Sequence, residues 1–247
     1  MNPISPIVRE QLAPHGVLSA AVYLGNFLLV TGRSPTGEPT GIAPDICRAV
    51  AERLGVELNL LGCDAQEEVV DSAASERCGI ALVGSDPARA QKVTFTPAYV
   101  ELEASYLVPA DSPIQEVSQV DQPGIRIASF HKSAYDHWLQ RNLKHATLVH
   151  ADSVRASNEL FVTEKLDALA GLKTGLVTVS QNIPGSRVLD GQFTGIQQAI
   201  ATKKSHLEAI AFLSECVEYF IATGLVAALI KKYQVQGLSP APLHKKP

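Results

Sequence analysis

Residues 41–61 read GIAPDICRAVAERLGVELNLL, and this stretch decides the fold class. Pro44 suits the first turn of a helix, where its missing N–H is not needed, and apolar residues follow at helical spacing up to Gly55. Residues 56–61 then form a short apolar run typical of a buried strand. Residues 17–23 form an earlier run of the same kind. A strand, a helix and a strand in this order predict a right-handed βαβ unit and therefore a parallel sheet.

The same alternation continues along the chain and begins afresh near residue 105, which predicts two α/β lobes in succession. Helices are expected over residues 67–74, 133–143, 207–221 and 225–233. Further strands are expected over residues 80–83, 106–108, 125–128, near 148, over 166–170 and over 194–201.

The composition is that of an ordinary globular protein. The chain has 247 residues, of which 46% are hydrophobic and 19% charged, enough for two lobes with separate cores. A formal net charge of -4 gives no field that would hold nucleic acid. The apolar segment Val17–Val30 is too short to span a bilayer and lacks the basic start and cleavage site of a signal peptide. As written, the chain is therefore expected in the cytoplasm, or in the periplasm if a leader is missing.

The four cysteines are Cys47, Cys63, Cys78 and Cys216. They form no CxxC pair and no Cys/His cluster at zinc-ligand spacing, so the sequence predicts no metal site. Buried free thiols are favoured, and a bridge between Cys63 and Cys78 remains open. No phosphate loop or GxGxxG motif is present, so no cofactor is predicted.

Four groups of residues carry a resemblance that extends over nearly the whole chain. They are residues 41–46 (GIAPDI) with 51–56 (AERLGV), 86–90 (DPARA) with 93–99 (VTFTPAY), 166–170 (LDALA), and 223–225 (TGL) with 230–233 (IKKY). In this order they resemble the family 3 extracellular solute-binding proteins, the polar amino-acid receptors of ABC importers.

The resemblance implies a two-lobed α/β Venus-flytrap of the periplasmic-binding-protein type II class. Lobe 1 would comprise residues 1–103 and 196–247, and lobe 2 residues 104–195. Hinges are implied near residues 101–106 and 192–196. Closure of such hinges around a ligand turns binding into a change of shape.

In lobe 1 the resemblance implies that Arg89 anchors a ligand carboxylate, because a guanidinium fork holds a carboxylate through two parallel hydrogen bonds. A solvated loop arginine is the alternative interpretation. Gly84 and Asp86 come just before it, at the end of a predicted strand, where α/β sheets bind their ligands.

The loop after the first strand contributes Tyr23, Asn26 and Phe27, which match the region where the family's aromatic residues contact ligand. Packing beneath the loop is an equally good interpretation of Phe27.

In lobe 2, the turn formed by His131, Lys132 and Ser133 precedes a helix, whose start favours an anion. Ser133 also suits the helix N-cap, and the two roles are compatible.

Two departures from the family concern the ligand's amino group. Amino-acid receptors of the family place an acidic residue where this chain has Leu172, and Lys173 follows it. The polar position five residues before Arg89 is occupied by Gly84. Because a buried unpaired ammonium is costly, we expect a carboxylate-bearing ligand that lacks the amino group or presents it differently. Asp86 or Glu103 remain alternatives for binding an ammonium.

The function predicted is reversible binding of a small carboxylate-bearing solute, an amino acid or a related organic acid. The protein would act as an ABC-transporter-type solute-binding protein with a permease as partner, or as a cytoplasmic counterpart. The alternative is a cytoplasmic lyase or dehydratase on the same fold, similar to cyclohexadienyl dehydratase. General acids or bases of suitable type are Asp86, Glu101, Glu103, His131 and Lys173. None lies in a motif specific to that activity, so binding is favoured over catalysis.

Overall fold

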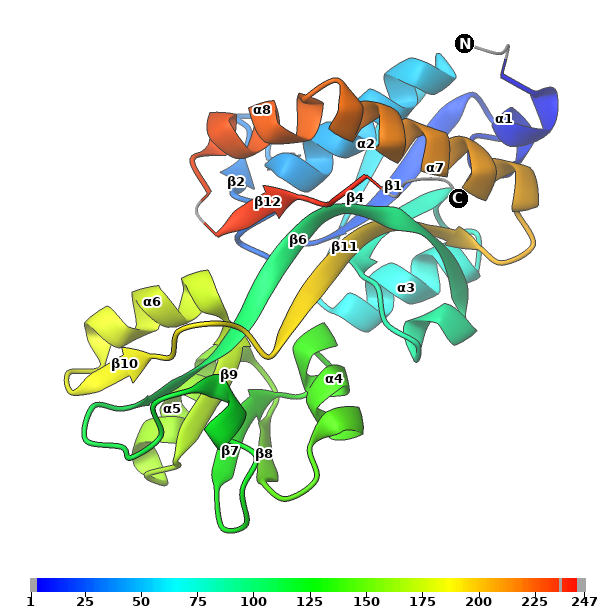
Figure 1. The fold of residues 1–247 in the computed structure, drawn as a ribbon. Coiled ribbons are helices and arrows are strands. Elements are labelled where there is room, and N and C mark those ends of the chain that lie inside the picture. Colours follow the sequence, from blue (N-terminus) through cyan, green and yellow to red (C-terminus); the bar gives the residue numbers. More distant parts are fainter. Residues whose placement is uncertain (1–3, 236, 244–247) are drawn as a thin grey trace. The chain divides into compact units, whose positions relative to one another are not determined.

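The computed structural model describes residues 4–235 and 237–243. The chain divides into two compact units, each with helices packed on a sheet (Figure 1). Unit 1 comprises Met1–Glu101 and Gln197–Pro247, and unit 2 comprises Leu102–Ile196. The alternating α/β pattern predicted from the sequence is present in both.

The helices of unit 1 are α1 (Pro6–Leu12), α2 (Ile42–Leu54), α3 (Gln66–Ala74), the short 3-10 helix η1 (Arg89–Gln91), α7 (Leu207–Ala222) and α8 (Leu225–Tyr233). Its strands are β1 (Val17–Tyr23), β2 (Gly32–Arg33), β3 (Pro39–Thr40), β4 (Glu57–Cys63), β5 (Ile80–Gly84) and β12 (Leu238–Pro240), with parts of β6 (Val93–Pro109) and β11 (Thr194–Lys203).

The sheet of unit 1 has the strand order β4-β1-β5-β11-β6. Strand β1 pairs in parallel with both β4 and β5, and β11 runs antiparallel to β5. The crossover from β1 to β4 goes one way along the sheet and the crossover from β4 to β5 returns. Right-handed crossovers in opposite directions place α2 and α3 on opposite faces, as Figure 1 shows. The predicted parallel βαβ unit is confirmed.

Helix α2 shows why the sequence of residues 41–61 folds as it does. Ile46, Val50 and Leu54 are fully buried on one face, and Gly55 ends the helix in the left-handed conformation at φ 69°. The helix begins at Ile42, two residues before the predicted start at Pro44. Proline is tolerated there because the N–H groups of the first turn have no partner within the helix.

The helices of unit 2 are the 3-10 helix η2 (Val117–Gln119), α4 (Ala134–Asn142), α5 (Val154–Thr163) and α6 (Lys173–Asn182). Its strands are β7 (Arg126–Phe130), β8 (Thr147–Ala151), β9 (Ala168–Leu172) and β10 (Ser186–Val188), with the remaining parts of β6 and β11.

Unit 2 repeats the topology of unit 1. Its strand order is β6-β9-β7-β8, with β7 parallel to both β8 and β9. Strand β6 runs antiparallel to β9 and pairs on its other side with β10. The core of this unit gathers apolar side chains from the sheet and from α5 and α6, among them Leu107, Phe161, Leu169 and Leu176.

Strand β6 is much longer than the sequence predicts. The predicted strand at residues 106–108 is only the end of a continuous strand of 17 residues, Val93–Pro109. Pro97 does not interrupt it, although proline removes a ladder donor. Both β6 and β11 contribute residues to each unit, since the chain crosses the unit boundary within them.

All four cysteines are buried and unpaired, so the preference for free thiols is confirmed and the bridge between Cys63 and Cys78 is not formed.

Within the described ranges, no single helix is long and apolar enough to cross a membrane. Helices α7 and α8 meet that test only together, and they are bent by 67° relative to each other.

Candidate functional site

The predicted site residues of unit 1 follow two neighbouring strands. Because β1 and β5 are parallel, with Val22 opposite Leu82, the loops after both strands leave the sheet at the same edge. That edge is where open α/β sheets bind ligands. Gly84 is the last residue of β5, and Asp86 and Arg89 follow it in the loop and in η1.

Arg89 is held by three acceptors from its own unit. Its Nη1 donates to the carbonyl oxygen of Gly84 at 2.7 Å, and its Nη2 donates to Oε1 of Gln66. Its Nε lies 3.3 Å from Oδ2 of Asp86. The guanidinium is therefore oriented by a network inside unit 1 rather than by solvent, and the alternative of a solvated loop arginine is wrong.

The Arg89 side chain is only 6% exposed and that of Asp86 only 3%, so both charges lie out of water. Burial lowers the pKa of Arg89 from its ordinary value, and the neighbouring Asp86 carboxylate opposes that shift. The other carboxylate oxygen of Asp86 accepts the backbone N–H groups of Ala88 and Arg89, at 2.8 and 3.1 Å. Asp86 thus holds the turn that leads into the short helix carrying Arg89.

The loop after β1 contributes its three predicted residues unequally. Tyr23 is half-buried and packs against the core, and burial, followed by the charges of Glu67 and Asp64, raises its pKa. Asn26 fixes the loop through its carbonyl oxygen, which accepts backbone N–H groups from the next turn. Phe27 is 53% exposed, so packing beneath the loop does not account for it.

In unit 2, the predicted turn is the start of α4. Ser133 is its N-cap: the hydroxyl oxygen accepts the N–H of Asp136 at 3.1 Å. Lys132 has a positive φ of 66°, and its N–H points to Oδ2 of Asp136 at 3.3 Å. The N-cap prediction is confirmed. The start of α4, which was predicted to bind an anion, is already occupied by the carboxylate of Asp136. This side chain is fully buried.

Asp136 also joins this turn to the neighbouring strand. Its Oδ1 lies 3.1 Å from Nε2 of His150, a residue of β8, in the geometry of an ion pair rather than of an aligned hydrogen bond. The ring of His150 stacks on that of His131, with centroids 4.6 Å apart. His131 is therefore positioned by ring stacking beside a buried acid.

Lys173 begins α6, directly after Leu172 ends β9. Its Nζ lies 3.0 Å from Oε2 of Glu103, a residue of β6 in the same unit. The antiparallel pairing of β6 with β9 brings these side chains together, since Ala104 pairs with Leu172. Lys173, which follows the position where the resemblance implied an acidic residue, is thus paired with Glu103 of the adjacent strand in the sheet.

Three residues of these arrangements were missed from the sequence: Gln66, Asp136 and His150. Asp136 has a local signal, since Ser133 followed three residues later by an acid is a helix N-terminal pattern. Gln66 and His150 have no such signal, because their contacts depend on how helix and strand pack.

Within residues 4–235 and 237–243, no group of three or more His, Cys, Asp or Glu side chains is placed to hold a metal ion.

Residues 27–236 match the bacterial extracellular solute-binding proteins, family 3. The chain belongs to this family. The match covers the end of β5, the turn before α4 and the helices α7 and α8, whereas β1 lies before its first residue. The resemblance proposed from sequence segments is confirmed. Comparison with curated protein sequences gives no significant match.

Solved structures of this family have the same fold. The solute receptor for L-cysteine of Neisseria gonorrhoeae is 17% identical, with a TM-score of 0.74 over 94% of this chain and 96% of that one. The cysteine-binding protein from Campylobacter jejuni is 17% identical, with a TM-score of 0.71 over 92% of each chain. An ancestral amino acid-binding protein, a precursor of cyclohexadienyl dehydratase, is 16% identical, with a TM-score of 0.71 over 93% of this chain and 99% of that one.

At these identities the likeness shows the fold, and it is the predicted type II periplasmic binding protein fold. The family is one of solute-binding proteins, so the coarse functional prediction is confirmed as well. The ligand role of each predicted residue stays a prediction.

The Arg89 network predicts an unequal pair of stability effects. Arg89→Ala should lower the free energy of unfolding by about 3–5 kcal/mol, because it leaves the buried Asp86 carboxylate without its cation. Arg77→Ala removes an exposed partner of Glu68, 3.2 Å away in the same unit, and should cost about 1 kcal/mol or less. Urea unfolding of both variants measures the difference; similar losses would contradict the network.

Proposed function

We propose that this protein reversibly binds a small carboxylate-bearing solute, as a solute-binding protein of the ABC-transporter type. The observation that carries the proposal is the buried, oriented guanidinium of Arg89 at the carboxyl edge of the unit 1 sheet. Membership of the solute-binding family supports the same reading. A guanidinium already fixed by its neighbours loses little entropy when it binds a ligand.

The acceptors around Arg89 suggest how a carboxylate enters. Asp86, the charged acceptor, lies at Nε, whereas Nη1 and Nη2 meet the neutral oxygens of Gly84 and Gln66. A carboxylate is a stronger acceptor for a guanidinium than a neutral amide, because it carries the opposite charge and can accept two parallel hydrogen bonds. Gln66 is partly exposed at the first position of α3, so its side chain can turn away. The solute carboxylate therefore replaces the Gln66 amide on Nη2.

The ion pairs of the site also affect whether it can bind the amino group of a solute. Two carboxylates were open as partners for an ammonium, Asp86 and Glu103. Asp86 is paired with Arg89, and Glu103 with Lys173. An ammonium would have to compete with these cations, whereas a hydroxyl or keto oxygen would not. We therefore infer that a 2-hydroxy or 2-oxo acid binds at least as tightly as the matching amino acid.

The contacts of the candidate acids and bases favour ligand binding over catalysis. Asp86, Glu103 and Lys173 each already contact a partner of opposite charge within their own unit. His131 is stacked on His150. These contacts favour a carrier working with a permease over the dehydratase alternative.

A matched panel of solutes tests the proposal. L-alanine with lactate, L-phenylalanine with phenyllactate, and L-glutamate with 2-hydroxyglutarate are compared by thermal shift and calorimetry. At least one hydroxy acid should stabilise the protein, by about 2.7 kcal/mol at a hundredfold excess over its Kd. Its amino counterpart should stabilise the protein less, and the hydroxy acid should be recovered chemically unchanged.

The control is a pair of Arg-to-Lys variants. Arg89→Lys keeps a cation beside Asp86 but loses the fork, so the stabilisation should disappear. Arg77→Lys, at the exposed pair with Glu68, should keep it. A wild-type response in Arg89→Lys, a preference for the amino acids, or conversion of the bound acid to a new product would contradict the proposal.

The displacement of Gln66 gives a separate prediction. Gln66→Ala should tighten binding of the hydroxy acid about fivefold, because the acid no longer breaks a hydrogen bond worth about 1 kcal/mol. Gln122→Ala, an exposed glutamine of unit 2, should leave the Kd unchanged. Weaker binding by Gln66→Ala would instead show that the glutamine contacts the solute.

A further inference from the structure

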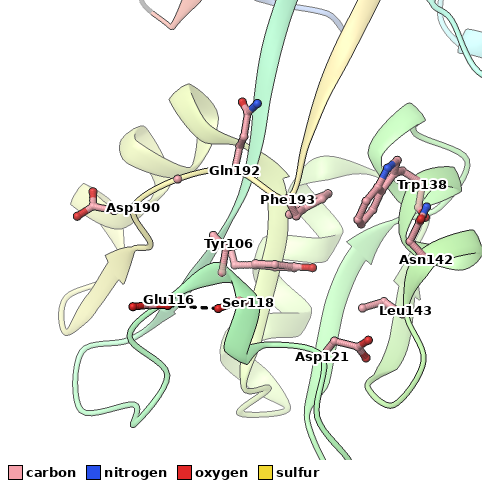
Figure 2. Close-up of a pocket in the computed structure, with 12 residues that line it drawn as sticks. Tyr106, Glu116, Ser118, Asp121, Trp138, Asn142, Leu143, Asp190, Gln192 and Phe193 are labelled. Atoms are coloured by element: carbon pink, nitrogen blue, oxygen red, sulfur yellow. Dashed lines mark hydrogen bonds between the residues drawn. The ribbon is translucent and has the colours of Figure 1, made fainter.

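Unit 2 contains a pocket apart from all the predicted site residues. Its volume is about 520 Å³, and its walls are the second half of β6, η2, the end of α4 and the loop of residues 190–193. Figure 2 shows the side chains that these four segments contribute, with Tyr106, Phe193 and Trp138 near one another. Pockets of this size suit small organic ligands.

Three aromatic rings form one wall of this pocket. The ring of Phe193 lies between those of Tyr106 and Trp138, with centroid distances of 4.5 and 5.5 Å. The planes are inclined by 33° and 37°, so the rings pack as a tilted cluster rather than a parallel stack. The faces and edges that this packing leaves open line the pocket, and an open ring face attracts cations.

Tyr106 adds a polar group that the protein itself does not use. The residue is 2% exposed, and among the described residues its hydroxyl makes no hydrogen bond. In Figure 2 its side chain points across the pocket toward the side where Trp138 and Leu143 lie. Burial raises its pKa, and the charge of Asp121 acts in the same direction, so the hydroxyl keeps its proton. The hydroxyl can therefore donate a hydrogen bond to an oxygen of a ligand in the pocket.

The charge of the lining is of one sign. Glu116, Asp121 and Asp190 contribute carboxylates, and no Lys, Arg or His lies among the described lining residues. Asp121 accepts backbone N–H groups from Lys144, His145 and Ala146. Burial acts to raise the pKa of Asp121, but these hydrogen bonds outweigh it and hold the pKa below its ordinary value. Its carboxyl group is therefore ionised more readily than that of an ordinary aspartate.

We propose that this pocket binds a small organic cation, a quaternary ammonium compound with a hydroxyl or other polar oxygen. The cationic head lies against Phe193 and Trp138, the carboxylates balance its charge, and Tyr106 donates to its oxygen. A bulky methylated ammonium suits this wall because it is weakly hydrated and bonds to no single acceptor. The site is independent of the carboxylate site in unit 1.

Trp138 reports on this pocket directly, since it is the chain's single tryptophan. Choline titrated into the full chain should change the tryptophan fluorescence to saturation. Its neutral isostere 3,3-dimethyl-1-butanol has the same shape without the charge, and it should bind at least tenfold more weakly. No saturable change with choline, or equal binding of the two compounds, would overturn the proposal.

Variants localise the binding. Asp190→Asn should weaken choline binding at least threefold, and Tyr106→Phe, which keeps the ring, should weaken it by a similar factor. Asp152→Asn, an exposed acid of unit 2 outside the pocket, is the matched control and should not change the Kd. Arg89→Lys should also leave choline binding intact, which separates this site from the carboxylate site. Wild-type Kd values in both pocket variants, or loss of binding in Arg89→Lys, would place choline elsewhere.

Discussion

The buried ion pair between Arg89 and Asp86 is the constraint on which the unit 1 site depends. Removing two charges from water costs several kcal/mol per ion, and the pair recovers this only because every contact is well placed. One oxygen of Asp86 lies beside Nε, and the other accepts the backbone N–H groups of Ala88 and Arg89. Gly84 supplies a carbonyl oxygen from the end of β5. The guanidinium is thus tied to the sheet itself, which lets it receive a ligand without first being ordered.

Charge pairing within each unit recurs among the charged groups of the predicted site. Arg89 is balanced by Asp86, Lys173 by Glu103, and the start of α4 by Asp136. A site built from balanced pairs has little net attraction for any ion. Selectivity then depends on which internal acceptor a solute can replace, and the neutral Gln66 amide is the weakest competitor on Arg89. The aromatic pocket of unit 2 differs in this respect, because its carboxylates face no cation among its lining residues.

Local sequence signals predicted the parts of the fold that depend on local chemistry. The helix ending at Gly55 follows from the left-handed conformation that glycine adopts readily, and the cap at Ser133 from its hydroxyl. The extent of β6 was missed, since the sequence pattern indicated only its end at residues 106–108. The contacts within the candidate site could not be predicted from local sequence signals, because they join residues that are far apart in the chain. Gln66 and Arg89 are 23 residues apart, and Glu103 and Lys173 are 70 apart. Only the packing of α3 and the register of β6 on β9 bring them together.

The most direct measurement is a crystal structure of the protein with its tightest-binding 2-hydroxy acid. The account predicts the solute carboxylate within hydrogen-bonding distance of Nη1 or Nη2 of Arg89, with the Gln66 side chain turned away and the pair with Asp86 retained. A bound acid that leaves the contact between Gln66 and Arg89 unchanged, with its carboxylate held elsewhere, would contradict it.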